Sequence, residues 1–339
     1  MEGYNKKVIM SYWTICRMKT TKKIYVKVSI IFLLGGILLF SSCEKEENQK
    51  IEANRKTLFM YLPWSSNLTN YFYNNISDLE KCITKIGLNN EKVIVFISTG
   101  STEAMMFEIV SSHGRCKREI LKKYKSPPFT TIDGITAILN DVKAFAPASV
   151  YTMIIGCHGM GWLPVYEMKV RSAPHMKMHW EYQGVPLTRY FGGLTAEYQT
   201  DIKSLASGIA NAGMKMEYIL FDDCYMSSIE VAYELKDVTK YLIGSTSEMM
   251  AYGMPYAAIG EYLLGNPDYQ SGCEEFYNFY STYEIMPCGT LAVTDCSELE
   301  NMAAIIKSIN SKYSFDKSLR GTIPVSYTHL RAHETSQDL

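Results

Sequence analysis

The chain has 339 residues, a hydrophobic fraction of 47% and a formal net charge of −1. Its length is enough to bury one large core or two modest ones. The near-neutral charge argues against a nucleic-acid partner, because proteins that bind nucleic acids carry a basic face.

The first segment with a clear pattern is the apolar run 28–40, which follows a lysine-rich stretch. The run is too short to span a bilayer, which takes about 20 residues, and its length fits a signal peptide. It ends in Phe-Ser-Ser before Cys43 and so resembles a bacterial lipobox, with Met18 the more natural start of the chain. We therefore expect a signal peptide over 1–43, lipidation of Cys43, and a membrane-anchored lipoprotein at the outer membrane, the cell surface or the periplasmic side. An ordinary signal peptide or anchor helix with an incidental cysteine is the alternative.

A polar tether follows at 44–55, and from Lys56 onward strand-like and helix-like segments alternate. Continuous β-branched runs predict buried strands, and apolar residues at helical spacing predict helices. The predicted strands are 57–63, 92–98, 149–159, 216–224, 241–248 and 289–295, and the predicted helices are 71–87, 130–147, 199–213 and 226–238. This alternation predicts an α/β fold with a mostly parallel central sheet and helices on both faces.

Two reactive side chains stand where predicted strands end, His158 and Cys224. Ligands of such sheets bind beyond the carboxyl ends of the strands. A helix that begins directly after Cys224 would favour its thiolate, and His158 would be the base. Gly159 would let the backbone approach a substrate and donate to an oxyanion. The structural alternative is a hydrogen-bonded buried histidine and a cysteine that only fills the core.

The sequences around these two residues resemble those of clostripain-like cysteine peptidases. The stretch "IIGCHGMGW" ends in the His-Gly-x-Gly-Trp pattern of that family, and "ILFDDCYMSSIEVAYEL" contains its Asp-x-Cys-x-Met pattern. A third stretch, "LIGSTSEMMAYGMPY", resembles the segment that follows. The resemblance covers residues 56–300 and implies a caspase-like α/β/α sandwich with endopeptidase activity.

The resemblance also implies roles for individual residues. Cys224 would attack the scissile carbonyl, and His158 would protonate the leaving amine. The backbone amides of Gly159 and Cys224 would form the oxyanion hole. Asp222 would lie at the mouth of the pocket for the residue before the scissile bond. As an alternative, Asp222 would cap a helix that begins near Tyr225.

Well-known relatives cleave after Arg or Lys, so the resemblance implies the same preference here. It fits an acidic pocket, because a buried guanidinium needs a carboxylate partner. Asp222 can supply one. Several relatives carry a second acid just before the glycine of the substrate loop, where this chain has Tyr252. Glu248, four residues upstream, would compensate. Asp222, Glu248 and Tyr252 are therefore the candidate substrate-binding residues.

No cofactor is required by the sequence, and the resemblance leaves calcium as a possible requirement. His175 and His179 stand four residues apart, but no companion acid is suitably placed, so we expect no metal site. The segment 165–190 contains several Lys and Arg residues and is a candidate for self-cleavage.

The peptidase domain is predicted over 56–324, truncated at its carboxyl end, with 325–339 resembling translated sequencing-adapter read-through. Protein or peptide substrates are the expected partners. Two other functions remain open: an inactive surface lipoprotein that binds peptides on the same fold, and a hydrolase of small amides.

Overall fold

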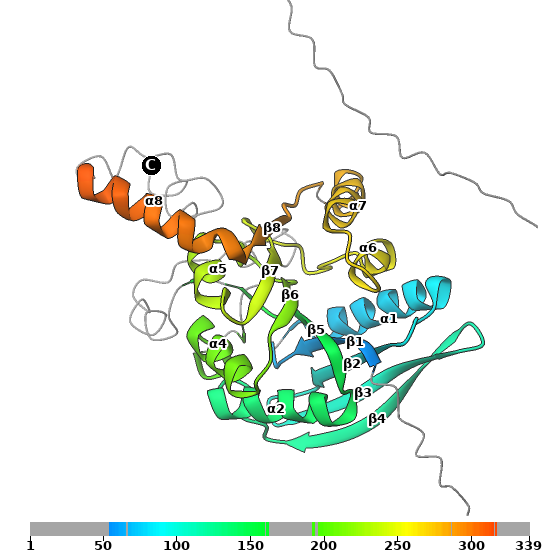
Figure 1. Cartoon of the computed structure of the whole chain (residues 1–339). Coiled ribbons are helices and arrows are strands. Elements are labelled where there is room, and N and C mark those ends of the chain that lie inside the picture. Colours follow the sequence, from blue (N-terminus) through cyan, green and yellow to red (C-terminus); the bar gives the residue numbers. More distant parts are fainter. Residues whose placement is uncertain are drawn as a thin grey trace, which may run out of the picture. The chain divides into compact units, whose positions relative to one another are not determined.

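The computed structural model describes residues 54–316, apart from 66, 160, 163–191, 194, 195, 286 and 315. The described residues form an eight-stranded sheet in the order β4-β3-β2-β1-β5-β6-β7-β8 (Figure 1). The strands are β1 (Asn54–Leu62), β2 (Glu91–Ser98), β3 (Glu103–Ser112), β4 (Arg115–Lys125), β5 (Ala148–Ile155), β6 (Met216–Phe221), β7 (Thr239–Gly244) and β8 (Ala292–Asp295). The helices are α1 (Thr69–Ile86), α2 (Ile132–Phe145), α4 (Ile202–Asn211), α5 (Ile229–Leu235), α6 (Tyr256–Leu263), α7 (Tyr269–Ser281) and α8 (Leu299–Lys312).

The central strands of the sheet are parallel. β1 pairs in parallel with β2 and β5, and β6 pairs in parallel with β5 and β7. The outer strands β3, β4 and β8 are antiparallel to their neighbours. Helices cover both faces of a parallel sheet, so its strands are apolar on both faces, and β2 is fully buried from Val93 to Ile97. The prediction of a mostly parallel sheet is confirmed.

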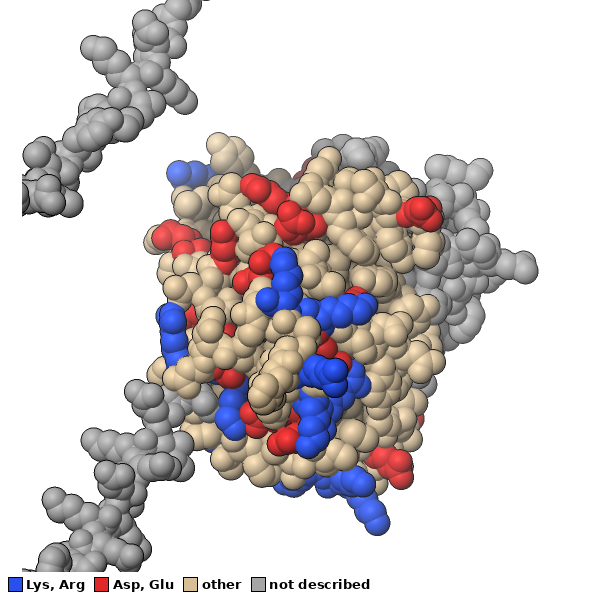
Figure 2. All heavy atoms as spheres, turned by 90° about the vertical axis from the view of Figure 1, so that its right-hand side faces the viewer, with Lys and Arg blue, Asp and Glu red and all other residues tan. Residues whose placement is uncertain are grey.

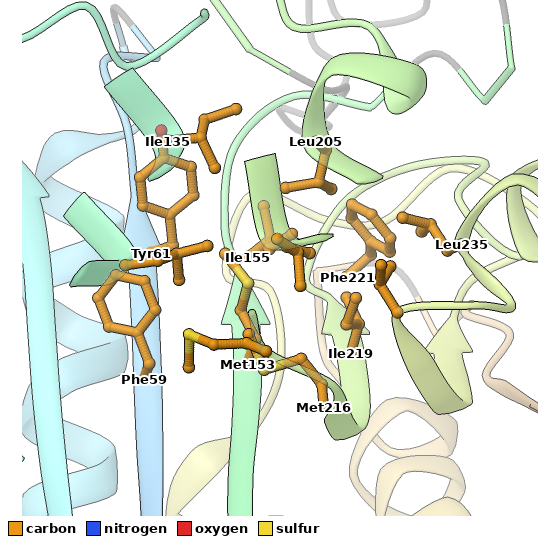
Figure 3. Packing of buried hydrophobic residues seen from close by; sticks show 14 of the residues in the cluster. Phe59, Tyr61, Ile135, Met153, Ile155, Leu205, Met216, Ile219, Phe221 and Leu235 are labelled. Carbon is orange, nitrogen blue, oxygen red and sulfur yellow. The ribbon is translucent and has the colours of Figure 1, made fainter. Parts of the chain in front are cut away.

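Two separate apolar clusters cover the two faces of the sheet. One joins the sheet to α2, α4 and α5, and the other joins it to α1, α6 and α7. Figure 3 shows the first cluster, in which side chains of β1, β5 and β6 meet those of the helices: Phe59, Tyr61, Met153, Ile155, Ile219 and Phe221 on the strands, and Ile135, Leu205 and Leu235 on the helices. The expected α/β/α sandwich is therefore confirmed.

All the predicted strands and helices are present, but several ends differ from the prediction. The predicted strand 149–159 ends at Ile155, the strand 216–224 ends at Phe221, and the helix predicted from 226 begins at Ile229. The β3–β4 hairpin and the helices α6, α7 and α8 were not predicted. The hairpin was missed because β4 is a charged outer strand whose residues are exposed or only half-buried.

The hairpin is held to the helical layer by ion pairs. Figure 2 shows the face where α1, α6 and the hairpin tip lie, with Lys and Arg side chains among Asp and Glu side chains. Arg118 of β4 makes two hydrogen bonds to the Glu80 carboxylate of α1, at 2.6 and 2.9 Å. Because this pair is bidentate and half-buried, it orients β4 better than an ordinary surface ion pair would.

Several sequence predictions concern residues outside the described part. These are the signal peptide with Cys43, the segment 165–190 with His175 and His179, and the tail 325–339. In the part that the structure does describe, no helix is both long and apolar enough to cross a membrane.

Candidate active site

Three neighbouring strands end at the same edge of the sheet, and the loop after each carries a polar side chain. Asn67 follows β1, His158 follows β5 and Cys224 follows β6. Parallel strands bring their carboxyl ends together, which is where α/β sheets bind ligands. The sheet order β1-β5-β6 therefore places these three loops side by side.

His158 is fully buried and held on two sides. Its backbone N–H donates to the Gly192 carbonyl at 3.2 Å. Its ring atom Nε2 lies 2.8 Å from Asn67 Oδ1. An amide oxygen only accepts hydrogen bonds, so this contact places a proton on Nε2.

Cys224 lies in a loop between β6 and α5. Tyr225 has a positive φ of 60°, which interrupts any helix started at the cysteine. α5 begins only at Ile229, where the Ser228 side chain accepts a hydrogen bond from the Val231 N–H. The expectation of a helix N-terminus directly after Cys224 is therefore wrong, and so is the alternative that Asp222 caps that helix.

The Cys224 sulfur receives a backbone hydrogen bond instead of a helix dipole. The Met249 N–H lies 3.2 Å from Sγ, and the Met249 carbonyl oxygen lies 3.7 Å from it. The Met249 N–H favours the thiolate, whereas the hydrogen bond from Sγ to the Met249 carbonyl and the burial of the side chain favour the thiol. Cys224 is 0% exposed, so a substrate carbonyl can reach Sγ only after the atoms that cover the side chain move.

The His158 loop and the Cys224 loop are in direct contact. A Cβ added to Gly159 would lie 2.2 Å from the Cys224 carbonyl oxygen and 2.9 Å from the Asp223 Cβ. The buried Asp223 carboxylate also accepts a hydrogen bond from the Cys157 N–H at 2.6 Å. Gly159 leaves room for the contact, and the hydrogen bond to the Asp223 carboxylate stabilises it. Both candidate reactive residues therefore belong to one site.

Asp222 points under the loop that follows β7. Its carboxylate accepts hydrogen bonds from the Met254 N–H at 2.8 Å and from the Tyr256 hydroxyl at 3.0 Å. Asp222 is 1% exposed. The carboxylate therefore helps to fix the shape of the 250–256 loop beside Cys224.

The two other candidate substrate-binding residues, Glu248 and Tyr252, lie in the segment between β7 and α6 and face different partners. The Tyr225 hydroxyl donates to Glu248 at 2.9 Å, and burial together with the Glu248 charge raises the pKa of Tyr225. The Tyr252 hydroxyl donates to Asp78 of α1 at 2.7 Å. Burial and this hydrogen bond raise the pKa of Tyr252. Glu248 thus lies next to the residue that follows Cys224, whereas the Tyr252 hydroxyl points toward α1.

Sequence reasoning gave no role to Asn67 or Asp223, although both hold His158 and its loop. Asn67 stands in the polar stretch after the first strand, so the rule about strand ends could have identified it. Asp223 could have been identified from its position between Asp222 and Cys224.

Among the described residues, no group of three or more His, Cys, Asp or Glu side chains is placed to hold a metal ion.

The sequence profile of the clostripain family, Peptidase_C11, matches residues 60–337. The match includes most of the tail for which we considered a foreign origin. No curated protein sequence matches the chain.

Several solved structures of cysteine proteases resemble the chain. A secreted C11 cysteine protease from Bacteroides thetaiotaomicron, "iotapain", is 59% identical, with a TM-score of 0.72 over 80% of this chain and 74% of that one. An inactive zymogen C11 protease from Parabacteroides distasonis is 25% identical, with a TM-score of 0.62 over 75% of this chain and 65% of that one. A second secreted C11 cysteine protease from Bacteroides thetaiotaomicron, in complex with an irreversible peptide inhibitor, is 20% identical and shows a likeness of fold alone, with a TM-score of 0.61 over 75% of this chain and 70% of that one.

Proposed function

Because the chain belongs to the clostripain family of cysteine peptidases, we propose that it is an endopeptidase in which Cys224 and His158 hydrolyse peptide bonds. The observation that carries this proposal is the contact between their two loops, where Gly159 lies against the Cys224 carbonyl. A thiol nucleophile needs a base within reach, and the paired strand ends supply both groups at one edge of the sheet.

The reaction proceeds in two steps. The Cys224 thiolate attacks the scissile carbonyl carbon, and a C–S bond forms while the carbonyl oxygen becomes an oxyanion. The backbone amides of Gly159 and Cys224 stabilise that oxyanion. The C–N bond then breaks, and the leaving amine takes a proton from the His158 imidazolium. In the second step His158 takes a proton from water, the hydroxide attacks the thioester, and the thiolate leaves. No step requires a cofactor.

We further propose cleavage after Arg or Lys, with Asp222 as the carboxylate that attracts the basic side chain. The supporting observation is the place of Asp222 under the 250–256 loop, two residues before the nucleophile. Glu248 adds a second negative charge near the site, because it lies beside Tyr225. Tyr252 contributes apolar surface to the loop and no charge.

Reporter peptides that end in Arg, Lys, Leu or Asp before the leaving group test this preference. We expect kcat/KM to be highest for Arg or Lys. Asp222→Asn is expected to lower the ratio of Arg to Leu hydrolysis by about tenfold or more, since one partner of a buried charge pair is worth about 2–5 kcal/mol. The ratio is the readout because Asp222 also shapes the loop. A neutral or acidic residue preferred by the unmodified enzyme would overturn the assignment.

We also propose that the enzyme is a lipoprotein anchored through Cys43. The small residues before Cys43 and the preceding apolar run support this proposal. In a bacterial host, Cys43→Ser is expected to abolish incorporation of labelled fatty acid and to release the protein from the membrane fraction. Cys273→Ser is the matched control, because that cysteine lies in α7, outside the predicted signal peptide. Equal labelling of both variants would refute the anchor.

A further inference from the structure

Asn67 lies between two segments that are themselves fixed. Before it, the buried Ser65 hydroxyl donates to the Pro63 carbonyl at 2.9 Å. After it, Leu68 is 0% exposed within the cluster beneath α1, and its carbonyl accepts from the Phe72 N–H at 3.0 Å. The chain is therefore anchored at Ser65 and at Leu68, although Asn67 itself is exposed.

The contact between Asn67 and His158 decides which ring nitrogen carries the proton. Asn67 Oδ1 lies 2.8 Å from His158 Nε2, and an amide oxygen can only accept a hydrogen bond. A neutral imidazole has one N–H and one lone pair, so a proton held on Nε2 leaves the lone pair on Nδ1. A residue of the β1 loop, remote in sequence from both reactive residues, would then select the tautomer.

We propose that Asn67 is a positioning residue that holds the His158 ring and makes Nδ1 the atom that exchanges protons during hydrolysis. This inference rests on the proposed function, in which His158 serves as the acid and base. Asn67 acts through the histidine and touches no reacting atom. Its loss therefore lowers the fraction of enzyme with a correctly oriented ring and leaves substrate binding intact.

The first test compares the kinetics of Asn67→Ala and Asn70→Ala. Asn70 is an exposed asparagine three residues away, at the start of α1, and is the matched control. We expect Asn67→Ala to lower kcat by about 10- to 100-fold with KM within about twofold, since small misplacements of a catalytic group cost up to about 10²-fold. The control is expected to match the unmodified enzyme.

A second variant separates positioning from a merely structural effect. Asn67→Asp keeps an oxygen that accepts from Nε2 but adds a negative charge, which favours the imidazolium. We expect the limb of the pH–rate profile that reports His158 to move upward by about one pH unit or more. A structural role for Asn67 would lower the rate and leave that limb in place.

The tautomer of His158 can also be determined without measuring peptide hydrolysis. In protein labelled with ¹⁵N in its six histidines, the His158 signals are identified by their absence from a His158→Ala sample. At alkaline pH, where the ring is neutral, we expect the proton on Nε2 in the unmodified enzyme and a mixture of tautomers in Asn67→Ala. The inference is overturned if Asn67→Ala keeps its kcat within twofold, or if the tautomer does not change. The proposed function fails separately, if the folded unmodified enzyme hydrolyses no peptide.

Discussion

Peptide hydrolysis is expected to disappear when Cys224 is replaced by alanine. The loss should be at least about 10⁴-fold in kcat, because removal of a nucleophile leaves only binding and oxyanion stabilisation. The measurement is the turnover of an Arg or Lys reporter peptide by purified Cys224→Ala. The fold should persist, with the free energy of unfolding lowered by no more than about 2 kcal/mol, since one buried sulfur is removed.

A matched variant controls for the loss of a thiol elsewhere in the molecule. Cys273 lies half-buried on α7, within an element that carries none of the candidate reactive residues. Cys273→Ala is expected to keep full activity. Residual activity of Cys224→Ala near that of the unmodified enzyme would mean that another group is the nucleophile.

The second large effect is expected from a single methyl group at Gly159. The added Cβ would lie 2.2 Å from the Cys224 carbonyl oxygen, so one of the two loops must move. We expect Gly159→Ala to lower kcat by at least about 10²-fold, because the nucleophile, the base and the oxyanion donors lose their alignment. The free energy of unfolding should fall by about 1–3 kcal/mol, the usual cost of overpacking. Reporter-peptide kinetics and chemical denaturation measure the two effects.

Gly100 is the control for this substitution. It follows β2, and a Cβ added there would meet nothing within 4 Å. Gly100→Ala is expected to leave both kcat and stability close to those of the unmodified enzyme. If Gly159→Ala behaved like Gly100→Ala, the two loops would not be in contact in the active form of the enzyme.

The sheet could be predicted because burial leaves a strong mark on sequence. A strand covered on both faces reads as a continuous apolar run, as in β2 from Val93 to Ile97. β4 has no such apolar run, since its exposed positions, apart from Ile120, carry Lys, Arg and Glu. Outer strands of this composition resist pairing with other chains, and the same charges make them resemble a surface loop.

The site could be predicted only in part, because loop conformation depends on single backbone angles. His158 and Cys224 follow the ends of apolar runs, and the parallel sheet brings those ends together. The start of α5 could not be inferred, since the positive φ of Tyr225 delays the helix and sequence gives little sign of it. Contacts such as Asn67 with His158 join residues 91 positions apart and follow from the sheet order.

Covalent labelling of the folded chain tests the central claim, that Cys224 is the nucleophile and His158 is its acid and base. The protein is treated with a peptidyl chloromethylketone ending in Arg, whose chloride a thiolate displaces, and the adduct is located by mass spectrometry. We predict an adduct on Cys224 alone, slower labelling of His158→Ala and none of Cys224→Ala. An adduct on a different cysteine would contradict the account. So would folded protein that no such probe labels, whatever the probe's terminal residue. A complete absence of labelling would favour a protein that binds peptides without cleaving them.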